Sequence, residues 1–476
     1  MALRKTDRRK RWVSRHAAFA GVCYRAEVNP AQAADRRASH RRVFTNAALV
    51  GILATATKLA GATKIVVTAR YFGAGDQLDA FVIAFLLPAF FSDIVAGSFG
   101  ASFVPAYIGV RSNQGEAAAR VFARTGLALV LGSMIVVSVL LAAGGRWLLP
   151  LLGSGFSAEK LRITDSLFLA LILWLPMSAS IAAWRAVLNA HNAFALAAAV
   201  PLTTPLATIA FLYAGANRWN VYTLCWGTLA GVAIETLILG WGVHRLGIPI
   251  RPAWRGWTPE MSAIRRQYIP LLAGTMFAAL CPLIDQAVAG SLGSGSVSAL
   301  AYGTKLASVL AAISATAIAT AVLPEFSRLA AQHDWSHLRH TVRVHSAVIA
   351  VLAVPAVAAI IWLSAPLVRT FFEGGAFDSS ATRVVTSVQQ FALLQVPFAI
   401  LFVVAGRLAV AISATAVMIR ASLITVAATA VGDLILAHAM GIAGIPLAGA
   451  LAHAIALASL AYLLYRREPR LFRATA

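Results

Sequence analysis

The sequence predicts an all-α polytopic membrane protein, with about 12 transmembrane helices in two six-helix lobes related by an internal repeat. Three observations indicate this fold class. Hydrophobic residues make up 59% of the 476 residues, charged residues make up 12%, and the mean hydropathy is +0.77. Apolar runs long enough to cross a bilayer recur along the chain. The second half of the chain also repeats features of the first half at a constant offset. A soluble globular domain is excluded, because such domains carry about twice this share of charged residues.

The predicted spans follow from the apolar runs, since a helix needs about 20 apolar residues to cross the hydrocarbon core. Several runs contain proline or glycine, which membrane helices tolerate where neighbouring helices or a cavity satisfy the freed backbone groups. The expected spans, in order, are 44–69, 79–107, 126–149, 164–188, 195–214, 220–243, 268–290, 297–324, 343–367, 385–411, 415–438 and 443–465.

Charge supports this count. The net charge of +22 is of the size found in nucleic-acid-binding proteins, but the basic residues lie between apolar runs and at the two ends. That pattern is typical of a membrane protein that obeys the positive-inside rule, so no nucleic-acid partner is expected. Most of the 40 Lys and Arg residues fall on one side of a twelve-span arrangement. We therefore expect a multi-pass protein of the bacterial inner membrane with both termini in the cytoplasm.

The same pattern predicts the domain organisation. Residues 1–42 hold 12 of the 40 Lys and Arg residues and no long apolar run. We expect them to be a disordered cytoplasmic arm that contacts anionic membrane lipids. The remaining segments are an N-terminal lobe at 43–246, a cytoplasmic linker at 247–267, a C-terminal lobe at 268–466 and a basic cytoplasmic tail at 467–476.

The internal repeat has an offset of about 220 residues. Phe156 in a glycine-containing loop corresponds to Phe377 in a similar loop, and Pro176 corresponds to Pro397; both pairs are 221 apart. Because each half has six spans, the two repeats share one orientation in the membrane. Transporters built from repeated halves place the substrate between them, near the midplane. The repeat therefore favours a transporter over a receptor.

Three lysines stand inside predicted spans. Lys58 and Lys64 lie in the first span and Lys305 in the eighth. A lysine at the bilayer centre costs roughly 2.5–3.5 kcal/mol, so it usually faces a bundle interior or a water-filled cavity. Six residues apart, Lys58 and Lys64 point about 120° apart on an ideal helix, and Gly61 between them allows a bend that would turn both toward one cavity. The alternative is that their side chains reach the membrane surface.

Carboxylates within spans form a second set. Asp79 and Asp93 in the second span are expected as cavity or gating carboxylates, with capping of its own helix as an alternative for Asp79. Asp285 and Asp433, in spans seven and eleven, are expected either to form a Na⁺ or H⁺ coupling site or to make salt bridges with the cavity lysines.

Catalytic signatures are not found. The chain has no G-x-x-x-x-G-K-[ST] phosphate loop, so ATP hydrolysis within it is not expected. Cys23, Cys225 and Cys281 have no metal-site or disulfide spacing, and no cofactor or metal is expected.

Characteristic motifs recur along the chain: ARYFGAGDQLDAFVIAFLLP and FGASFVPAY in the second-span region, LNAHNAF after span four, YGTKLASVLAAISATAIATAVLPEFSRLA in span eight, and FFEGGAF in the ninth loop. Together they resemble the MurJ/MviN lipid II flippases of the multidrug/oligosaccharidyl-lipid/polysaccharide exporter superfamily. The resemblance implies two six-helix lobes around a cationic cavity and no enzymatic activity. It implies a flippase that moves an undecaprenyl-diphosphate-linked oligosaccharide, a lipid II-like precursor, for peptidoglycan synthesis by alternating access. In this interpretation Lys58, Lys64 and Lys305 bind the diphosphate.

The chain departs from the family pattern at the proposed site. The family typically has arginines where this chain has Lys58, Lys64 and Lys305, and a basic pair where it has Ser92 and Asp93. Family members commonly have about fourteen spans, and this chain has twelve. Lysine binds phosphate as a point charge, whereas arginine offers a bidentate fork. A flippase for a lipid-linked exopolysaccharide unit therefore stays open as an alternative. A cation-coupled drug exporter and a non-transporting membrane scaffold are further alternatives.

Overall fold

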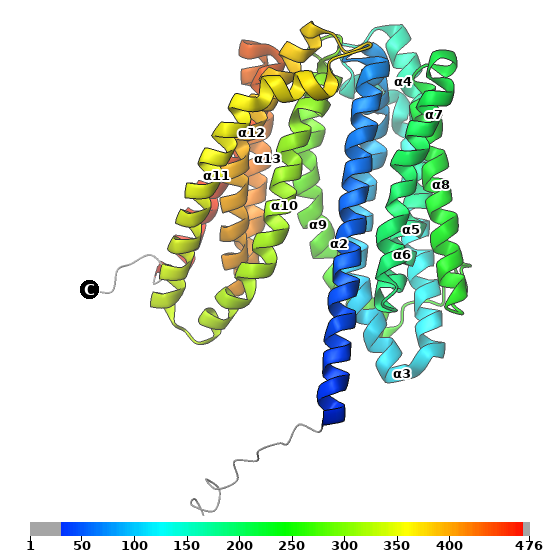
Figure 1. Ribbon diagram of the computed structural model, residues 1–476, viewed down its shortest axis with the longest axis vertical. Helices are drawn as coiled ribbons and strands as arrows, with labels where there is room; N and C mark the ends of the chain where they lie inside the picture. Colours follow the sequence, from blue (N-terminus) through cyan, green and yellow to red (C-terminus); the bar gives the residue numbers. More distant parts are fainter. Residues whose placement is uncertain (1–29, 470–476) are drawn as a thin grey trace, which may run out of the picture. The chain divides into compact units, whose positions relative to one another are not determined.

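The computed structural model describes the backbone of residues 30–469 and the side chains of residues 49–469, apart from six positions in α3 and α9 (Figure 1). Contacts divide the chain into a small unit, Met1–Ile52, and a large unit, Leu53–Ala476. In the small unit, the described residues form the first part of helix α2 (Pro30–Phe72). Residues 30–42 were expected to be disordered and are instead helical, since Pro30 starts a run of good helix formers. The rest of the predicted arm lies outside the described residues.

The first half of the large unit runs from the end of α2 to α8. The longest helix in it, α3, covers predicted spans two and three and the connection between them. That connection was expected to be a loop, but it is helical up to a sharp bend at Gly115, where φ is +84°. The other helices are α4 (Ala158–Leu171), α5 (Trp174–Ala190), α6 (Phe194–Ala199), α7 (Thr203–Trp219) and α8 (Tyr222–Arg245), after α3 (Asp76–Leu152).

Predicted span four covers α4 and α5. α4 ends at Leu171 and α5 begins at Trp174, two residues before Pro176, and the two residues between them keep helical backbone angles. Proline lacks a backbone N–H and its ring clashes with the carbonyl four residues back, here that of Ile172. The repeat-related Pro397 lies inside a continuous α12. The regular hydrogen bonding of the helix is therefore interrupted just before Pro176, without a change of backbone conformation, and it is not interrupted before Pro397.

Small residues allow α7 and α8 to pack closely. Gly227 and Gly231 stand four residues apart on α8, and a Cβ added at Gly227 would lie 2.8 Å from the Cα of Thr208 on α7. A Cβ at Gly231 would meet the backbone of Thr204. Such small-xxx-small spacing lets backbones approach within a membrane, where the hydrophobic effect does not drive helices together.

The second half consists of α9–α14. It begins after a segment that packs on α3: Ala253 N–H donates to the Arg124 carbonyl over 3.3 Å, and Arg124 Nε donates to the Arg251 carbonyl over 3.1 Å. The helices are α9 (Pro259–Ala289), α10 (Ser296–Ala331), α11 (Trp335–Phe372), α12 (Ser379–Ala411), α13 (Thr415–Met440) and α14 (Gly444–Arg467).

The all-α polytopic prediction is confirmed within the described residues. They contain no strand, and nine helical stretches are long and apolar enough to cross a membrane. Three of the nine contain more than one helix: Ala158–Ala190 contains α4 and α5, Phe194–Trp219 contains α6 and α7, and Thr415–Arg467 contains α13 and α14. Predicted span seven falls in α9, where Gly274–Ala289 is apolar. The division into two six-helix lobes and a linker stays a prediction.

The two repeat-related loops make reciprocal contacts. In the first half, Gly155 N–H donates to the Gly290 carbonyl at the end of α9 over 3.1 Å. In the second half, Ala376 N–H donates to the Arg70 carbonyl near the end of α2 over 2.8 Å. Since α2 and α9 are the first helices of the two halves, each loop docks on the first helix of the opposite half. These contacts lie at the predicted outer side, the top of the view in Figure 1.

Candidate functional site

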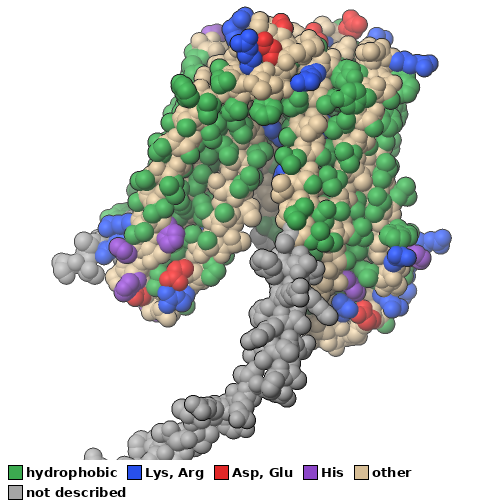
Figure 2. All heavy atoms as spheres, in the orientation of Figure 1, with side chains coloured by type: hydrophobic (Ala, Val, Ile, Leu, Met, Phe, Trp, Pro, Cys, Tyr) green, Lys and Arg blue, Asp and Glu red, His purple; other side chains and the backbone are tan. Residues whose placement is uncertain are grey.

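The three lysines singled out from the sequence face one another. Lys58 and Lys64 lie on α2 and Lys305 lies on α10, in the other half, and Lys305 interacts electrostatically with both. Lys58 and Lys305 are exposed, and Lys64 is half-buried. The space-filling view shows a hollow between the two groups of helices with Lys or Arg side chains inside it (Figure 2). The structure therefore assembles a cationic cluster from both halves.

The bend expected at Gly61 is absent. Helix α2 runs through this position, and no neighbouring atom approaches within 4 Å of where a Cβ would stand. Both lysines nevertheless lie within electrostatic range of Lys305. Threonines on the same helix keep their hydroxyls bonded within it: Thr68 Oγ1 donates to the Lys64 carbonyl over 2.8 Å.

Asp93 belongs to the same cluster. It is exposed on α3 and interacts electrostatically with Lys305. Its neighbour Ser92 is buried and donates to Ser178 Oγ on α5 over 3.1 Å. The two adjacent residues therefore have different roles: Ser92 joins α3 to α5, and Asp93 adds a negative charge beside the lysines.

Asp79 lies elsewhere, at the contact between the halves. Its side chain is fully buried, and it accepts hydrogen bonds of 2.7 Å from the backbone N–H groups of Gly295 and Ser298. It also pairs with Lys160 Nζ at 2.8 Å. The expectation that Asp79 caps its own helix is wrong, because it caps α10 of the second half. Gly295, the N-cap of α10, has no side chain to do so and adopts φ +78°.

Lys160 was missed as a site residue. The sequence placed it among the loop cations, yet it is only 6% exposed and binds Asp76 Oδ1 at 2.7 Å as well as Asp79. Its Nζ also stands 3.9 Å from the ring centroid of Phe156, in the repeat-related loop. The sequence did contain an indication of this role. Asp76 and Asp79 stand one helical turn apart at the start of a span, and two carboxylates so close together are stabilised by a nearby cation.

Asp285 and Asp433 lie together in the second half, on α9 and α13. They interact electrostatically with each other, and within the described residues no ion pair joins either of them to a lysine. Both Asp433 oxygens and one of Asp285 are buried without a hydrogen-bond partner there. One turn away, Thr429 Oγ1 approaches Cys281 Sγ at 3.6 Å. The alternative of salt bridges to the cavity lysines is therefore not supported.

Another mid-span carboxylate is paired. Glu235 on α8 accepts a 2.6 Å hydrogen bond from the guanidinium of Arg185 on α5. Arg185 lies in predicted span four and was not singled out as a site residue; its partly buried side chain joins α5 to α8. This pair differs from the cationic cluster in two ways. It joins two helices of the same half, and its charges cancel.

Comparison with known proteins decides the family. Residues 68–475 match the family described as lipid II flippase MurJ. The chain belongs to the MurJ family. A lipid II flippase MurJ from Burkholderia cenocepacia is 25% identical over 338 residues, which cover 69% of this chain and 66% of that protein. The matched stretch thus spans just under two thirds of that relative. A probable lipid II flippase MurJ from Rhizobium tropici is 25% identical over 433 residues, 88% of this chain and 80% of that protein.

Solved structures agree with the MurJ fold. A lipid II flippase MurJ in an inward closed conformation superimposes with a TM-score of 0.74 at 21% identity, covering 87% of both chains. An inward-facing multidrug resistance transporter of the MATE family superimposes with a TM-score of 0.72 at 13% identity, covering 89% of this chain and 96% of that one. At such identities the likeness concerns the fold alone.

Proposed function

We propose that this MurJ-family chain is a flippase rather than an enzyme, and that it moves an undecaprenyl-diphosphate-linked cell-wall precursor across the bacterial inner membrane for peptidoglycan synthesis. The observation that carries the proposal is the cluster of Lys58, Lys64 and Lys305. A diphosphate carries the charge that three lysines in a membrane need as a partner. Because the cluster draws on both halves, a relative movement of the halves moves the lysines apart or together, as alternating access requires.

The topology expected from charge belongs to this proposal. Both termini would lie in the cytoplasm, with the basic tail against anionic headgroups, and the Asp79 contacts would then lie at the outer side. No cofactor is needed for the movement of a lipid headgroup.

The test removes single charges from the cluster. Lys58→Ala and Lys305→Ala should each abolish transport of a lipid-linked diphosphate in proteoliposomes, while Lys305→Arg should keep most of it. Arg420→Ala, which removes an exposed cation from α13, is the matched control. Folded, inserted Lys58→Ala and Lys305→Ala proteins with full activity would overturn the proposal.

The alternative cargo is a lipid-linked exopolysaccharide unit. Lysines in place of arginines, and Asp93 beside them, favour a site that differs from the usual one of the family. One experiment distinguishes the two cargoes: the protein is depleted, and the undecaprenyl-linked oligosaccharide that accumulates is identified. Lipid II would support peptidoglycan synthesis, and another glycan would support exopolysaccharide export.

We further propose that Asp285 and Asp433 bind the coupling ion, Na⁺ or H⁺. Buried carboxylate oxygens without a partner are costly unless a cation or proton neutralises them. A cation held between α9 and α13 would link ion binding to the packing of the second half.

A further inference from the structure

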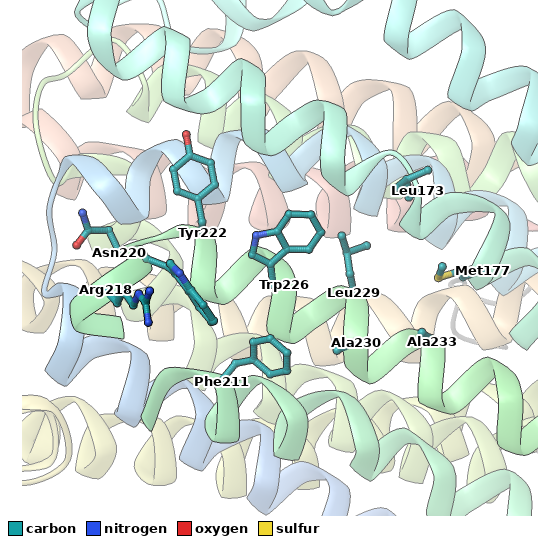
Figure 3. A pocket seen from close by; sticks show the side chains of 11 residues that line it. Leu173, Met177, Phe211, Arg218, Asn220, Tyr222, Trp226, Leu229, Ala230 and Ala233 are labelled. Carbon is teal, nitrogen blue, oxygen red and sulfur yellow. The ribbon is translucent and has the colours of Figure 1, made fainter. Parts of the chain in front are cut away.

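A groove on the first half lies away from the cationic cluster. It has a volume of about 860 Å³ and lies among α5, α7 and α8 and the turn that joins the last two. This is within the size range of pockets that hold a small molecule, roughly 300–1,000 Å³. Figure 3 shows side chains from these elements turned toward one space. Its lining includes Met177, Phe211, Trp226, Leu229, Ala230 and Ala233.

One end of the groove is polar. Arg218 at the end of α7, Asn220 in the turn and Tyr222 at the start of α8 gather there, as Figure 3 shows. Arg218 is exposed and has no ion-pair partner in the described part of the chain. Tyr222 is held in place by a 2.8 Å hydrogen bond to Ser166 on α4. A positive charge without a partner therefore stands at the mouth of an apolar groove.

The depth of the groove matches one leaflet. From Tyr222 to Ala233 along α8 is eleven residues, or about 16 Å at 1.5 Å per residue. Half of a hydrocarbon core of about 30 Å is about 15 Å. Tyrosine and tryptophan at the polar end are typical of the headgroup level. Since the polar end coincides with the ends of two spans, the groove extends from headgroup depth to the middle of the bilayer.

We propose that this groove binds one glycerophospholipid of the surrounding leaflet. One acyl chain lies along Trp226, Leu229 and Ala233, and the phosphate binds Arg218 with Asn220 beside it. The small side chains of Ala230 and Ala233 on α8 leave room for the chain. The lipid is distinct from the transported cargo, because Lys58, Lys64 and Lys305 do not line the groove.

The test measures lipid retention. The purified full chain is incubated with vesicles of phosphatidylethanolamine and phosphatidylglycerol, re-extracted in detergent and examined by native mass spectrometry. We expect one phospholipid to stay bound to the wild-type protein. Arg218→Gln should reduce its occupancy about tenfold, the size expected for loss of one charge-assisted hydrogen bond. Arg146→Gln is the matched control, since Arg146 also lies near a helix end beside a tryptophan but is not among the residues that line this groove.

A second variant fills the groove instead of changing its charge. Ala233→Phe should also lose the lipid, and size-exclusion chromatography and thermal melting show whether it is folded. Arg218→Gln replaces an exposed side chain, so its folding is not at risk. Unchanged retention in Arg218→Gln would overturn the proposal. Retention of an undecaprenyl phosphate in place of a glycerophospholipid would overturn it as well.

Discussion

Asp79 on α3 caps the helix of the opposite half: its Oδ2 accepts a 2.7 Å hydrogen bond from Gly295 N–H, at the start of α10. Lys160 neutralises the same carboxylate at 2.8 Å. The backbone N–H groups at a helix N-terminus favour a negative charge, so this contact is reinforced by α10 itself. The Asp79 latch, consisting of Asp79, Lys160, Gly295 and Ser298, thus holds the two halves together at the predicted outer side.

We expect Asp79→Ala to open this contact. It leaves Lys160 buried without its main partner and two N–H groups of α10 without an acceptor. Removing one partner of a buried ion pair costs about 3–5 kcal/mol. The melting temperature in detergent should fall sharply. A cysteine introduced at Ser298 should react faster with a membrane-impermeant thiol reagent in Asp79→Ala than in the parent.

Asp76→Asn is the control for the latch. Asp76 binds the same lysine at 2.7 Å, but its side chain is 61% exposed. Exposed pairs contribute about 0–1 kcal/mol. If Asp76→Asn destabilised the protein as much as Asp79→Ala, the role given to helix α10 would be wrong.

Asp93 should weaken anion binding at the lysine cluster. Its carboxylate competes with a diphosphate for Lys305. Asp93→Asn should therefore tighten binding of a lipid-linked diphosphate several-fold, the effect of a unit charge at short range in a partly screened site. A dissociation constant measured for the purified protein at two salt concentrations checks this. Asp93→Glu, which keeps the charge, should bind like the wild type, and weaker binding by Asp93→Asn would contradict the assignment.

Gly231 and Gly132 should respond oppositely to alanine. A Cβ at Gly231 meets the backbone of Thr204, whereas nothing lies within 4 Å of a Cβ at Gly132 on α3. Gly231→Ala should separate α7 from α8 and destabilise the protein, because overpacking costs about 1–3 kcal/mol. Gly132→Ala should stabilise it by up to about 1 kcal/mol through helix propensity. Equal melting temperatures for the two variants would refute the close packing of α7 and α8.

The apolar spans and the two repeat-related loops could be predicted because they depend on local composition, whereas the contacts of these loops with the opposite half were not predicted. Apolar runs mark helices whatever their neighbours are. The offset of 221 residues between Phe156 and Phe377 also corresponds to a real relationship, since both loops contact the opposite half. The proximity of Lys58 and Lys305 followed from reasoning about charge inside a membrane, a strong constraint that few other positions share.

The remaining features depend on tertiary contacts that composition does not encode. Lys160 lies in a predicted loop and Arg185 lies in predicted span four. Neither was expected to pair with a carboxylate, and each does so within the first half. Helix hydrogen bonding is interrupted before Pro176 and not before Pro397, although both occupy the same place in the repeat. These features depend on which side chains and backbone groups of neighbouring helices lie close to each residue, and composition does not determine that.

His191 should make stability depend on pH. It follows α5 outside the span, and its Nε2 lies 2.8 Å from the hydroxyl of Tyr107. Burial, together with the charge of Arg111, lowers the pKa of His191 below 6.5. The unfolded chain therefore binds the proton first, and stability is full above about pH 6.5 and declines as the pH falls below it. The decline cannot exceed about 1.4 kcal/mol per pH unit for one proton.

The measurement compares melting temperatures at pH 7.5 and 5.5. His191→Gln should lose stability at pH 7.5 and show a smaller difference between the two pH values than the wild type. His340→Gln, an exposed change near the start of α11, should leave the difference unchanged. A larger acid sensitivity in His191→Gln would show that the sign of the argument is wrong.

Asp433 should decide whether an ion binds between α9 and α13. The wild-type melting temperature should rise on addition of Na⁺, or on lowering the pH, because a ligand that binds only the folded state stabilises it. Asp433→Asn should abolish that rise, and it should remove the effect of the corresponding gradient on transport in proteoliposomes. Asp378→Asn is the control: Asp378 caps α12 outside the membrane, and asparagine caps as well as aspartate. A gradient effect that persists in both Asp433→Asn and Asp285→Asn would place the coupling ion elsewhere.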